Sequence, residues 1–179
     1  MSDTDIYDLV DKRDPILRET LPRFDFNNPP VDPIELAHRL AKTMLANNGL
    51  GLAANQCGLR YRVFVLKASP ILCCFNPVIV DVSSKIEDLD EGCLTFPGLS
   101  FKVKRPSMIK VRFTQPNGEV VNQRFIGMTA RAFQHELDHL NGIVFADHVG
   151  ETKLKLAINR AKKLGHSYMI GDLHSREIA

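Results

Sequence analysis

The feature that most constrains this chain is the pentapeptide at residues 135–139, His-Glu-Leu-Asp-His. On an α-helix, side chains four residues apart lie one above the other on the same face, so His135 and His139 can both reach one metal ion. Glu136, beside the first histidine, can act on a water molecule held at that ion. The pentapeptide therefore predicts an active site, a metal cofactor and a hydrolytic reaction together.

The residues around the pentapeptide predict a helix over residues 128–140. This stretch lacks glycine and proline, Thr129 can cap its start, and Gly142 can end it. Phe133 and Leu137 lie on one apolar stripe that would face the core. We expect the metal-binding face to run along the flank of this stripe.

Two histidines do not complete a catalytic metal site, which usually takes three protein ligands and leaves a position for water. In one class of metalloproteases the third histidine follows a glycine, in the spacing H-E-x-x-H-x-x-G-x-x-H. This chain keeps Gly142 but has Phe145 at the ligand position, and phenylalanine cannot bind a metal ion. The remaining candidates for the third ligand are Cys57, Cys73, Cys74, Cys93, Asp147, His148, Glu151, His166 and His174.

The composition is that of a globular chain. Its 179 residues, 44% hydrophobic and 25% charged, suit a single domain over residues 1–179, in which residues 166–179 are expected to be a tail. The net charge of +2 argues against a general nucleic-acid binder, and no apolar run approaches the length of a membrane span. The acidic, polar start resembles neither a signal nor a transit peptide, so we expect a cytoplasmic protein with four free thiols.

The order of the expected elements favours an α+β fold. Asp32 and Pro33 predict the start of a first helix, residues 47–49 its end, and a last helix is expected over residues 153–164 with Thr152 as its cap. Short runs rich in β-branched or aromatic residues predict strands at 62–67, 71–75, 78–82, 99–103, 108–113 and 120–125. Because hairpin spacing favours antiparallel pairing, we expect antiparallel sheets packed around a central helix that carries the metal motif.

Two further segments have an unusual composition. Residues 49–56 are small, apolar and glycine-rich and end in Gln56; glycines allow a positive φ and the close approach of another backbone. The segment lacks the Lys-Ser/Thr of a phosphate loop and, by itself, is typical of a tight turn into a strand. Residues 91–95 place Cys93 beside a glycine and ahead of a turn, where a single cysteine is often a small buried apolar residue.

Together these three segments resemble the motifs of the peptide deformylase family. That family has a glycine-rich motif ending in glutamine (here residues 49–56), an E-G-C-L motif (here 91–94) and a Q-H-E-x-D-H motif (here 134–139), in this order and with similar spacing. The resemblance extends from residue 14 to the last helix. The chain departs from the family at Asn55, where threonine, valine or proline is common, and at Thr95, where serine is usual.

The resemblance implies an enzyme that hydrolyses the N-formyl group of N-formylmethionine at the start of nascent polypeptides and releases formate. It implies one metal ion per chain, typically Fe(II), with Zn, Ni or Co able to take its place. The ligands that it implies are Cys93, His135 and His139. Glu136 would then move the proton of the attacking water, and the Gln56 amide and the Leu94 backbone N–H would meet the developing oxyanion.

The same resemblance and the helical spacing imply where the substrate binds. The residues expected around the methionine side chain and the peptide backbone are Gly49, Leu50, Gly51, Met128, Arg131 and Ala132, with Arg131 at the rim. Asp138 points away from the histidine face, and we expect it to pair with Arg105 and hold the helix against the sheet. The basic outer face of the last helix is either a solvated surface or a contact with ribosomal RNA. No membrane or DNA partner is expected.

Two other classes of function remain as alternatives. A metallopeptidase that cuts internal peptide bonds explains the helix motif but gives Cys93 and Gln56 no task. A non-catalytic protein that binds a metal ion or a formylated peptide would not need a base at Glu136.

Overall fold

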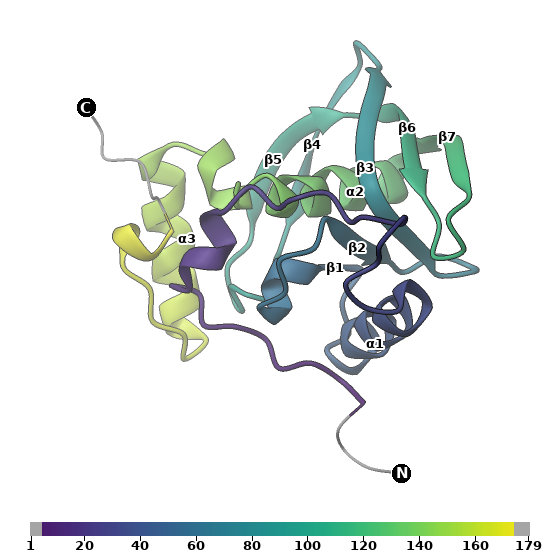
Figure 1. Cartoon of the computed structure of the whole chain (residues 1–179). Coiled ribbons are helices and arrows are strands. Elements are labelled where there is room, and N and C mark those ends of the chain that lie inside the picture. Colours follow the sequence, from purple (N-terminus) through teal and green to yellow (C-terminus); the bar gives the residue numbers. More distant parts are fainter. Residues whose placement is uncertain (1–4, 174–179) are drawn as a thin grey trace.

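The computed structural model describes residues 5–173, in which two antiparallel sheets are joined through one central helix (Figure 1). The larger sheet has the strand order β1-β2-β3-β6-β7, and the smaller sheet pairs β4 with β5. The strands are β1 (Gly51–Ala53), β2 (Val63–Leu66), β3 (Leu72–Val82), β4 (Ile86–Glu91), β5 (Phe101–Pro106), β6 (Met108–Thr114) and β7 (Val120–Ile126). The α-helices are α1 (Pro33–Ala46), α2 (Gly127–Leu140) and α3 (Glu151–Lys163), and the 3-10 turns are η1 (Pro15–Arg18), η2 (Ala54–Cys57), η3 (Phe145–His148) and η4 (Ile170–Asp172). The expected α+β class is confirmed.

The larger sheet is covered on both faces. Phe64 and Leu66 of β2 belong to the apolar cluster that α2 completes, whereas Val63 and Val65 belong to the cluster that α1 completes. Successive side chains of a strand point to opposite faces, so a strand with a helix on each side is apolar at every position. This is why β2 reads Val-Phe-Val-Leu without a polar residue.

A third apolar cluster fills the space between β5, α3 and η3. Phe101 of β5 stacks on Phe145 of η3 with ring centroids 4.4 Å apart, and Leu154 of α3 is fully buried beside them. Since α2 contacts both the larger sheet and β5, it lies between the two sheets. The helix that carries the metal motif is therefore held on two sides.

Several boundaries differ from those expected. The two strands expected at 71–75 and 78–82 form one strand, β3, whose register shifts between Phe75 and Val78. Thr129 does not cap α2, which starts at Gly127 with Ile126 at its N-cap and no side-chain cap. Thr152 likewise lies inside α3 rather than at its cap, which is Gly150.

Two short strands were not expected at all. Strand β1 lies in the glycine-rich segment, which we interpreted as a turn, and β4 has the sequence Ile-Glu-Asp-Leu-Asp-Glu. Acidic residues are depleted in strands, so local preference argues against β4. It forms because β5 pairs with it along its whole length, from Ile86 with Pro106 to Glu91 with Phe101.

The chain beyond α3 is packed as far as it is described. Tyr168 is 8% exposed and Leu173 is fully buried, so the tail expected from residue 166 begins no earlier than residue 174. Residues 174–179, which include His174, lie outside the described residues. Within residues 5–173, no helix combines the length and the apolar character that crossing a membrane requires.

Candidate metal centre and active site

Three potential metal ligands meet where α2 passes the end of β4. Cys93 follows β4, and His135 and His139 lie one turn apart on α2. One ligand atom from each residue lies within 4.8 Å of the other two, and Cys93 Sγ is 3.3 Å from His139 Nε2. Among the described residues, this is the single group of three such side chains with this spacing.

The donor atoms fit a metal ion. In a tetrahedral site with metal–sulfur and metal–nitrogen bonds of ordinary length, the ligand atoms are about 3.5 Å apart. The distance of 3.3 Å between Cys93 Sγ and His139 Nε2 is close to this value, and a thiol with two imidazoles leaves the fourth position for water or substrate. A thiolate with two imidazoles suits several transition metals, so the donor set does not select one ion.

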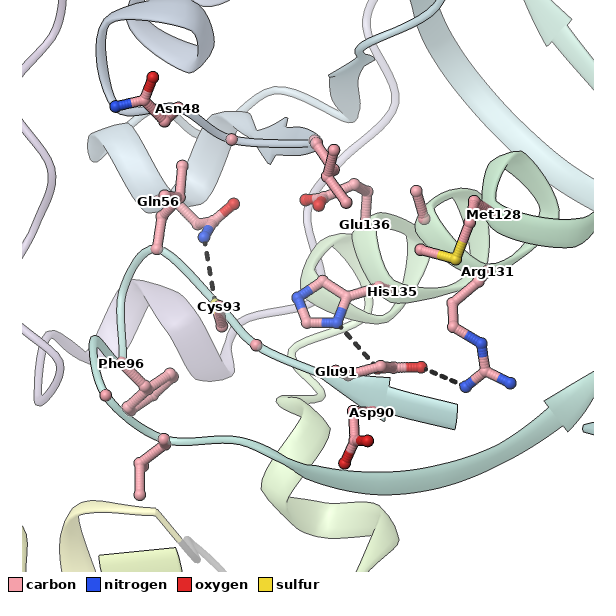
Figure 2. A pocket seen from close by; sticks show the side chains of 18 residues that line it. Asn48, Gln56, Asp90, Glu91, Cys93, Phe96, Met128, Arg131, His135 and Glu136 are labelled. Atoms are coloured by element: carbon pink, nitrogen blue, oxygen red, sulfur yellow. Dashed lines mark hydrogen bonds and ion pairs between the residues drawn. The ribbon is translucent and has the colours of Figure 1, made fainter. Parts of the chain in front are cut away.

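A buried carboxylate from β4 orients the first histidine. Glu91 Oε2 is 3.0 Å from His135 Nδ1, which leaves Nε2 of that ring to face the metal site (Figure 2). The same carboxylate accepts hydrogen bonds from Arg105, at 2.6 and 3.0 Å, and from Arg131, at 2.8 Å. A histidine that ligates a metal usually donates its outer N–H to such an acceptor, which fixes the tautomer and the ring orientation.

The charges around the ligands explain their proton affinities. Burial acts to raise the pKa of Glu91, but the hydrogen bonds from His135 and Arg105 outweigh it and hold this pKa well below its usual range. Burial acts to lower the pKa of His135, but the contacts with Cys93 and Glu91 hold it above its ordinary value. Burial lowers the pKa of His139, which keeps that ring in the neutral form that a metal ion binds.

Glu136 is buried beside the candidate metal ligands. Its side chain is 4% exposed overall, and its Oε2 is buried without a hydrogen-bond partner among the described residues. Burial raises the pKa of Glu136 to about 7, against the opposing effect of His135. A carboxyl group balanced near neutrality can both accept and donate a proton, as a general acid–base catalyst must.

Gly51 makes room for this carboxylate. A Cβ atom at position 51 would lie 2.7 Å from Glu136 Cγ and 2.8 Å from its Cδ, closer than van der Waals contact permits. The φ angles of Gly49 and Gly51 are not positive, so lack of space rather than backbone conformation requires glycine at position 51. Strand β1 can thus pass directly over the catalytic face of α2.

Gln56 points its amide nitrogen at the site. Its Oε1 accepts a hydrogen bond from the Ala53 N–H at 2.9 Å, and its Nε2 lies 3.0 Å from Thr95 Oγ1 and 3.5 Å from Cys93 Sγ. The Ala53 contact fixes which end of the amide faces the metal site. Thr95, which departs from the family's serine, keeps the hydroxyl that accepts from Gln56.

A cavity of about 380 Å³ opens beside the ligands. Its lining includes Cys93, His135 and Glu136, the two residues expected to meet the oxyanion, and all six residues expected to bind substrate: Gln56 and Leu94, and Gly49, Leu50, Gly51, Met128, Arg131 and Ala132. Leu50 and Met128 are 56% and 55% exposed, so they form an apolar edge at the mouth. This volume is at the lower end of those typical of small-molecule sites.

The position of Arg131 corrects one expectation. We expected it at the exposed rim, but it is only 5% exposed and binds Glu91 and the carbonyl oxygens of Val103 and Glu87, each carbonyl at 2.7 Å. Its guanidinium therefore faces the buried carboxylate rather than solvent. This contact helps to neutralise Glu91, because a buried carboxylate is stable only when cations pair with it. Figure 2 shows its guanidinium turned toward Glu91.

Arg105 and Asp138 lie as expected, with Arg105 Nη1 2.8 Å from Asp138 Oδ2. His148 Nε2 contacts the same carboxylate oxygen at 2.7 Å, so this candidate ligand supports Asp138 instead of the metal site. The other described candidates for the third ligand do not join the group of Cys93, His135 and His139: Cys57, Cys73, Cys74, Asp147, Glu151 and His166.

Three residues with contacts at the site were not assigned a role from the sequence. Glu91 stands at the head of the E-G-C-L segment, and its position two residues before a ligand was the available signal. Thr95 was noted only as a departure from the family. Asn55, the other departure, donates its amide to the His139 carbonyl oxygen at 2.7 Å, a contact that no local pattern indicates.

Comparisons of the sequence with known proteins give one consistent result. A family model described as polypeptide deformylase matches residues 6–155. The peptide deformylase of Carboxydothermus hydrogenoformans is 39% identical over 143 residues, which cover 79% of this chain and 92% of that protein. That of Wolbachia pipientis subsp. Culex pipiens is 35% identical over 148 residues, covering 75% and 83%.

Solved structures show the same arrangement of the chain. A peptide deformylase from Synechococcus elongatus, in complex with actinonin, has a TM-score of 0.84 and 29% identity and covers 94% of this chain and 90% of that one. The peptide deformylase from Thermotoga maritima has a TM-score of 0.77 and 33% identity, with coverage of 81% and 98%.

Proposed function

The chain belongs to the peptide deformylase family, and on that basis we propose that Cys93, His135 and His139 hold the metal ion of its reaction. The enzyme removes the N-formyl group from nascent peptides. The observation that carries the assignment is the convergence of three donor atoms within 4.8 Å beside a buried carboxylate oxygen of Glu136 that has no hydrogen-bond partner within residues 5–173. The metallopeptidase and binder alternatives gain no support from this arrangement.

We propose Fe(II) as the ion, with Zn, Ni or Co able to replace it. When bound, such an ion lowers the pKa of a water molecule and polarises the formyl oxygen. Glu136 accepts the proton of that water at its carboxylate and delivers it to the departing amine. Gln56 Nε2–H and the Leu94 backbone N–H donate to the oxygen on which negative charge develops.

The cavity accounts for the choice of substrate. A formyl carbon carries only hydrogen on one side, so a crowded site admits it and excludes larger acyl groups. The methionine side chain lies between Leu50, Met128 and Ala132, and the peptide backbone runs along Gly49 and Gly51, to which it can add as a strand. Arg131 acts on this site through Glu91.

The experiment is formate release from formyl-Met-Ala-Ser by Fe- or Ni-loaded protein kept away from oxygen. We expect rapid formate release without cleavage between methionine and alanine. Glu136→Gln should keep its metal ion and lose turnover, whereas Glu119→Gln, an exposed control, should resemble the wild type. A Glu136→Gln variant with full turnover would contradict the proposed base, and loss of the ion by that variant would contradict a purely catalytic role.

We also propose that α3 contacts ribosomal RNA and that the protein works in the cytoplasm, where its substrates emerge. Support comes from the exposed basic residues on the outer face of this helix: Lys153, Lys155, Arg160, Lys162 and Lys163. Removing the helix would expose the core that Leu154 fills, so charge reversal is the cleaner test. Glutamate at positions 160, 162 and 163 should reduce co-sedimentation with ribosomes, whereas glutamate at 110, 112 and 124, three exposed basic positions on β6 and β7, should not. Equal sedimentation of both variants with the wild type would refute the contact.

A further inference from the structure

The segment that follows α3 returns to the loop that carries Cys93. We call residues 166–173 the C-terminal strap and residues 92–99 the Cys93 loop. The Tyr168 hydroxyl donates a hydrogen bond to the Pro97 carbonyl oxygen at 2.6 Å, and the Tyr168 ring lies 6.5 Å from that of Phe96, centroid to centroid. His166 packs against Gly98, where a Cβ atom would be 3.1 Å from its Cγ.

The strap is itself fixed by the N-terminal segment. Lys12 Nζ donates to the Ser167 carbonyl oxygen at 2.5 Å and lies 4.2 Å from the centre of the Tyr168 ring. Arg18 donates to the carbonyl oxygen of Leu173 at the other end of the strap. In Figure 1 the yellow strap lies beside the purple N-terminal segment, in agreement with these contacts.

The Cys93 loop is held by Gln56, which binds Thr95, and by the burial of Phe96 beside Phe145, but by little pairing of its backbone. It lies between β4 and β5 but outside their pairing, which ends at Glu91 and Phe101. Its own backbone hydrogen bonds are two short-range ones, from Phe96 N to the Cys93 carbonyl at 3.0 Å and from Leu99 N to the Phe96 carbonyl at 3.2 Å. The position of the thiol therefore also depends on the strap, which adds contacts to Phe96 and Pro97.

A metal ligand has little tolerance in position, because a catalytic site has to be held within about 0.5 Å of its working geometry. We propose that Tyr168 is a positioning residue for the Cys93 thiolate: by holding Pro97 and covering Phe96, it fixes the loop that carries this ligand. Lys12 acts in the same direction by holding the strap. This inference depends on the proposed function of Cys93 as a metal ligand.

The test uses the full-length protein loaded with Co(II), because a bound thiolate gives a sulfur-to-cobalt absorption band. The band in the wild type and its loss in Cys93→Ser establish the ligand. Tyr168→Phe removes one hydroxyl and keeps the ring; we expect the band to remain and Co(II) release to a chelator to become about threefold to tenfold faster, as loss of one hydrogen bond allows. Lys12→Met should accelerate release in the same direction.

The matched control is Tyr61→Phe, because Tyr61 packs on Phe24 in a different apolar cluster. It should release Co(II) at the wild-type rate. Wild-type release rates in both Tyr168→Phe and Lys12→Met would overturn the role of the strap. A wild type without the thiolate band would overturn the ligand assignment and the inference with it. Lys12→Met touches neither the loop nor the metal site, so its release rate decides the question if Tyr168→Phe fails to fold.

Discussion

Replacing Glu91 with glutamine removes the charge on which three side chains converge. The Glu91 side chain is 4% exposed and bridges two arginines and the metal-facing His135. Arg105 and Arg131 are similarly buried, at 6% and 5%. The substitution keeps the shape of the side chain, so its effect reports the charge and the hydrogen bonds rather than a cavity.

The size of the loss in unfolding free energy depends on the contacts that Arg105 and Arg131 keep in the variant. Removing one member of a buried ion pair costs about 3–5 kcal/mol. Arg105 keeps Asp138 at 2.8 Å, and Arg131 keeps two carbonyl oxygens at 2.7 Å. We therefore expect the lower end, a loss of about 3 kcal/mol in the free energy of unfolding. For a chain of this length, that lowers Tm by roughly 6–12 °C.

The same substitution should weaken metal binding about 10- to 100-fold, because His135 loses a charged acceptor at Nδ1. Urea unfolding of the metal-free protein measures the first effect, and competition with a chelator measures the second. Glu87→Gln is the control, since Glu87 lies on the same strand and its carboxylate forms an ion pair with the exposed Lys85 at 3.1 Å. An unfolding free energy within about 1 kcal/mol of the wild type, with unchanged metal affinity, would refute the reasoning.

The pH dependence of this stability has a defined sign. The pKa of Glu91 is lower in the folded protein than the usual glutamate value of 4.5. Its stabilising contribution is therefore complete above pH 4.5 and is lost as pH falls through the folded pKa. The part of the difference in unfolding free energy between wild type and Glu91→Gln that comes from this carboxylate should shrink on acidification below that value. A difference that grows on acidification would contradict the assignment.

Two further substitutions and one chemical modification test the surroundings of the site. Gly51→Ala should reduce kcat about 100-fold, because its methyl displaces Glu136; formate release measures it, and wild-type turnover would count against the clash. Thr95→Val should lower kcat about tenfold by freeing the Gln56 amide, whereas Thr95→Ser should not; equal rates would exclude this role. Burial raises the pKa of Cys57 to about 12, that of Cys73 to about 11 and that of Cys74 as well, so iodoacetamide should alkylate these three thiols more slowly than Cys93 in metal-free protein; mass spectrometry showing the reverse order would contradict this.

The sequence was sufficient for the parts of the fold that local patterns determine. Helix α1 begins at Pro33 because Asp32 accepts a hydrogen bond from the Glu35 N–H at 2.8 Å, and this cap is visible in the residue order. The apolar stripe of α2 and the alternation in β6 likewise report their buried faces. Strands β1 and β4 could not be predicted, because β1 is short and glycine-rich and β4 is acidic. Their pairing partners, β2 and β5, determine both.

The candidate site likewise combines residues that local patterns predict with residues that only the fold brings together. The histidine pair and its adjacent glutamate follow from helix geometry alone, whereas Cys93 was one of nine candidates until the three motifs were considered together. Helix spacing predicts the direction in which the Arg131 side chain leaves the helix but not its partner, so the sequence alone predicts a position at the rim. Only the fold shows that β4 brings a carboxylate within reach of its guanidinium. Long-range contacts of this kind leave no periodic signal in the sequence.

The spacing of Glu91 and Cys93 links the metal ligands to the fold. With one glycine between them, a single short peptide supplies a thiol to the metal site and a carboxylate to the outer nitrogen of His135. That carboxylate is already neutralised by Arg105 and Arg131, so it needs no metal ion to remain buried. Small domains whose ligands are their main restraint unfold when the metal ion is removed. In this protein the apolar clusters and the buried ion pairs hold the candidate ligands in place, so we expect the proposed metal ion to bind to a site that the folded chain has already formed.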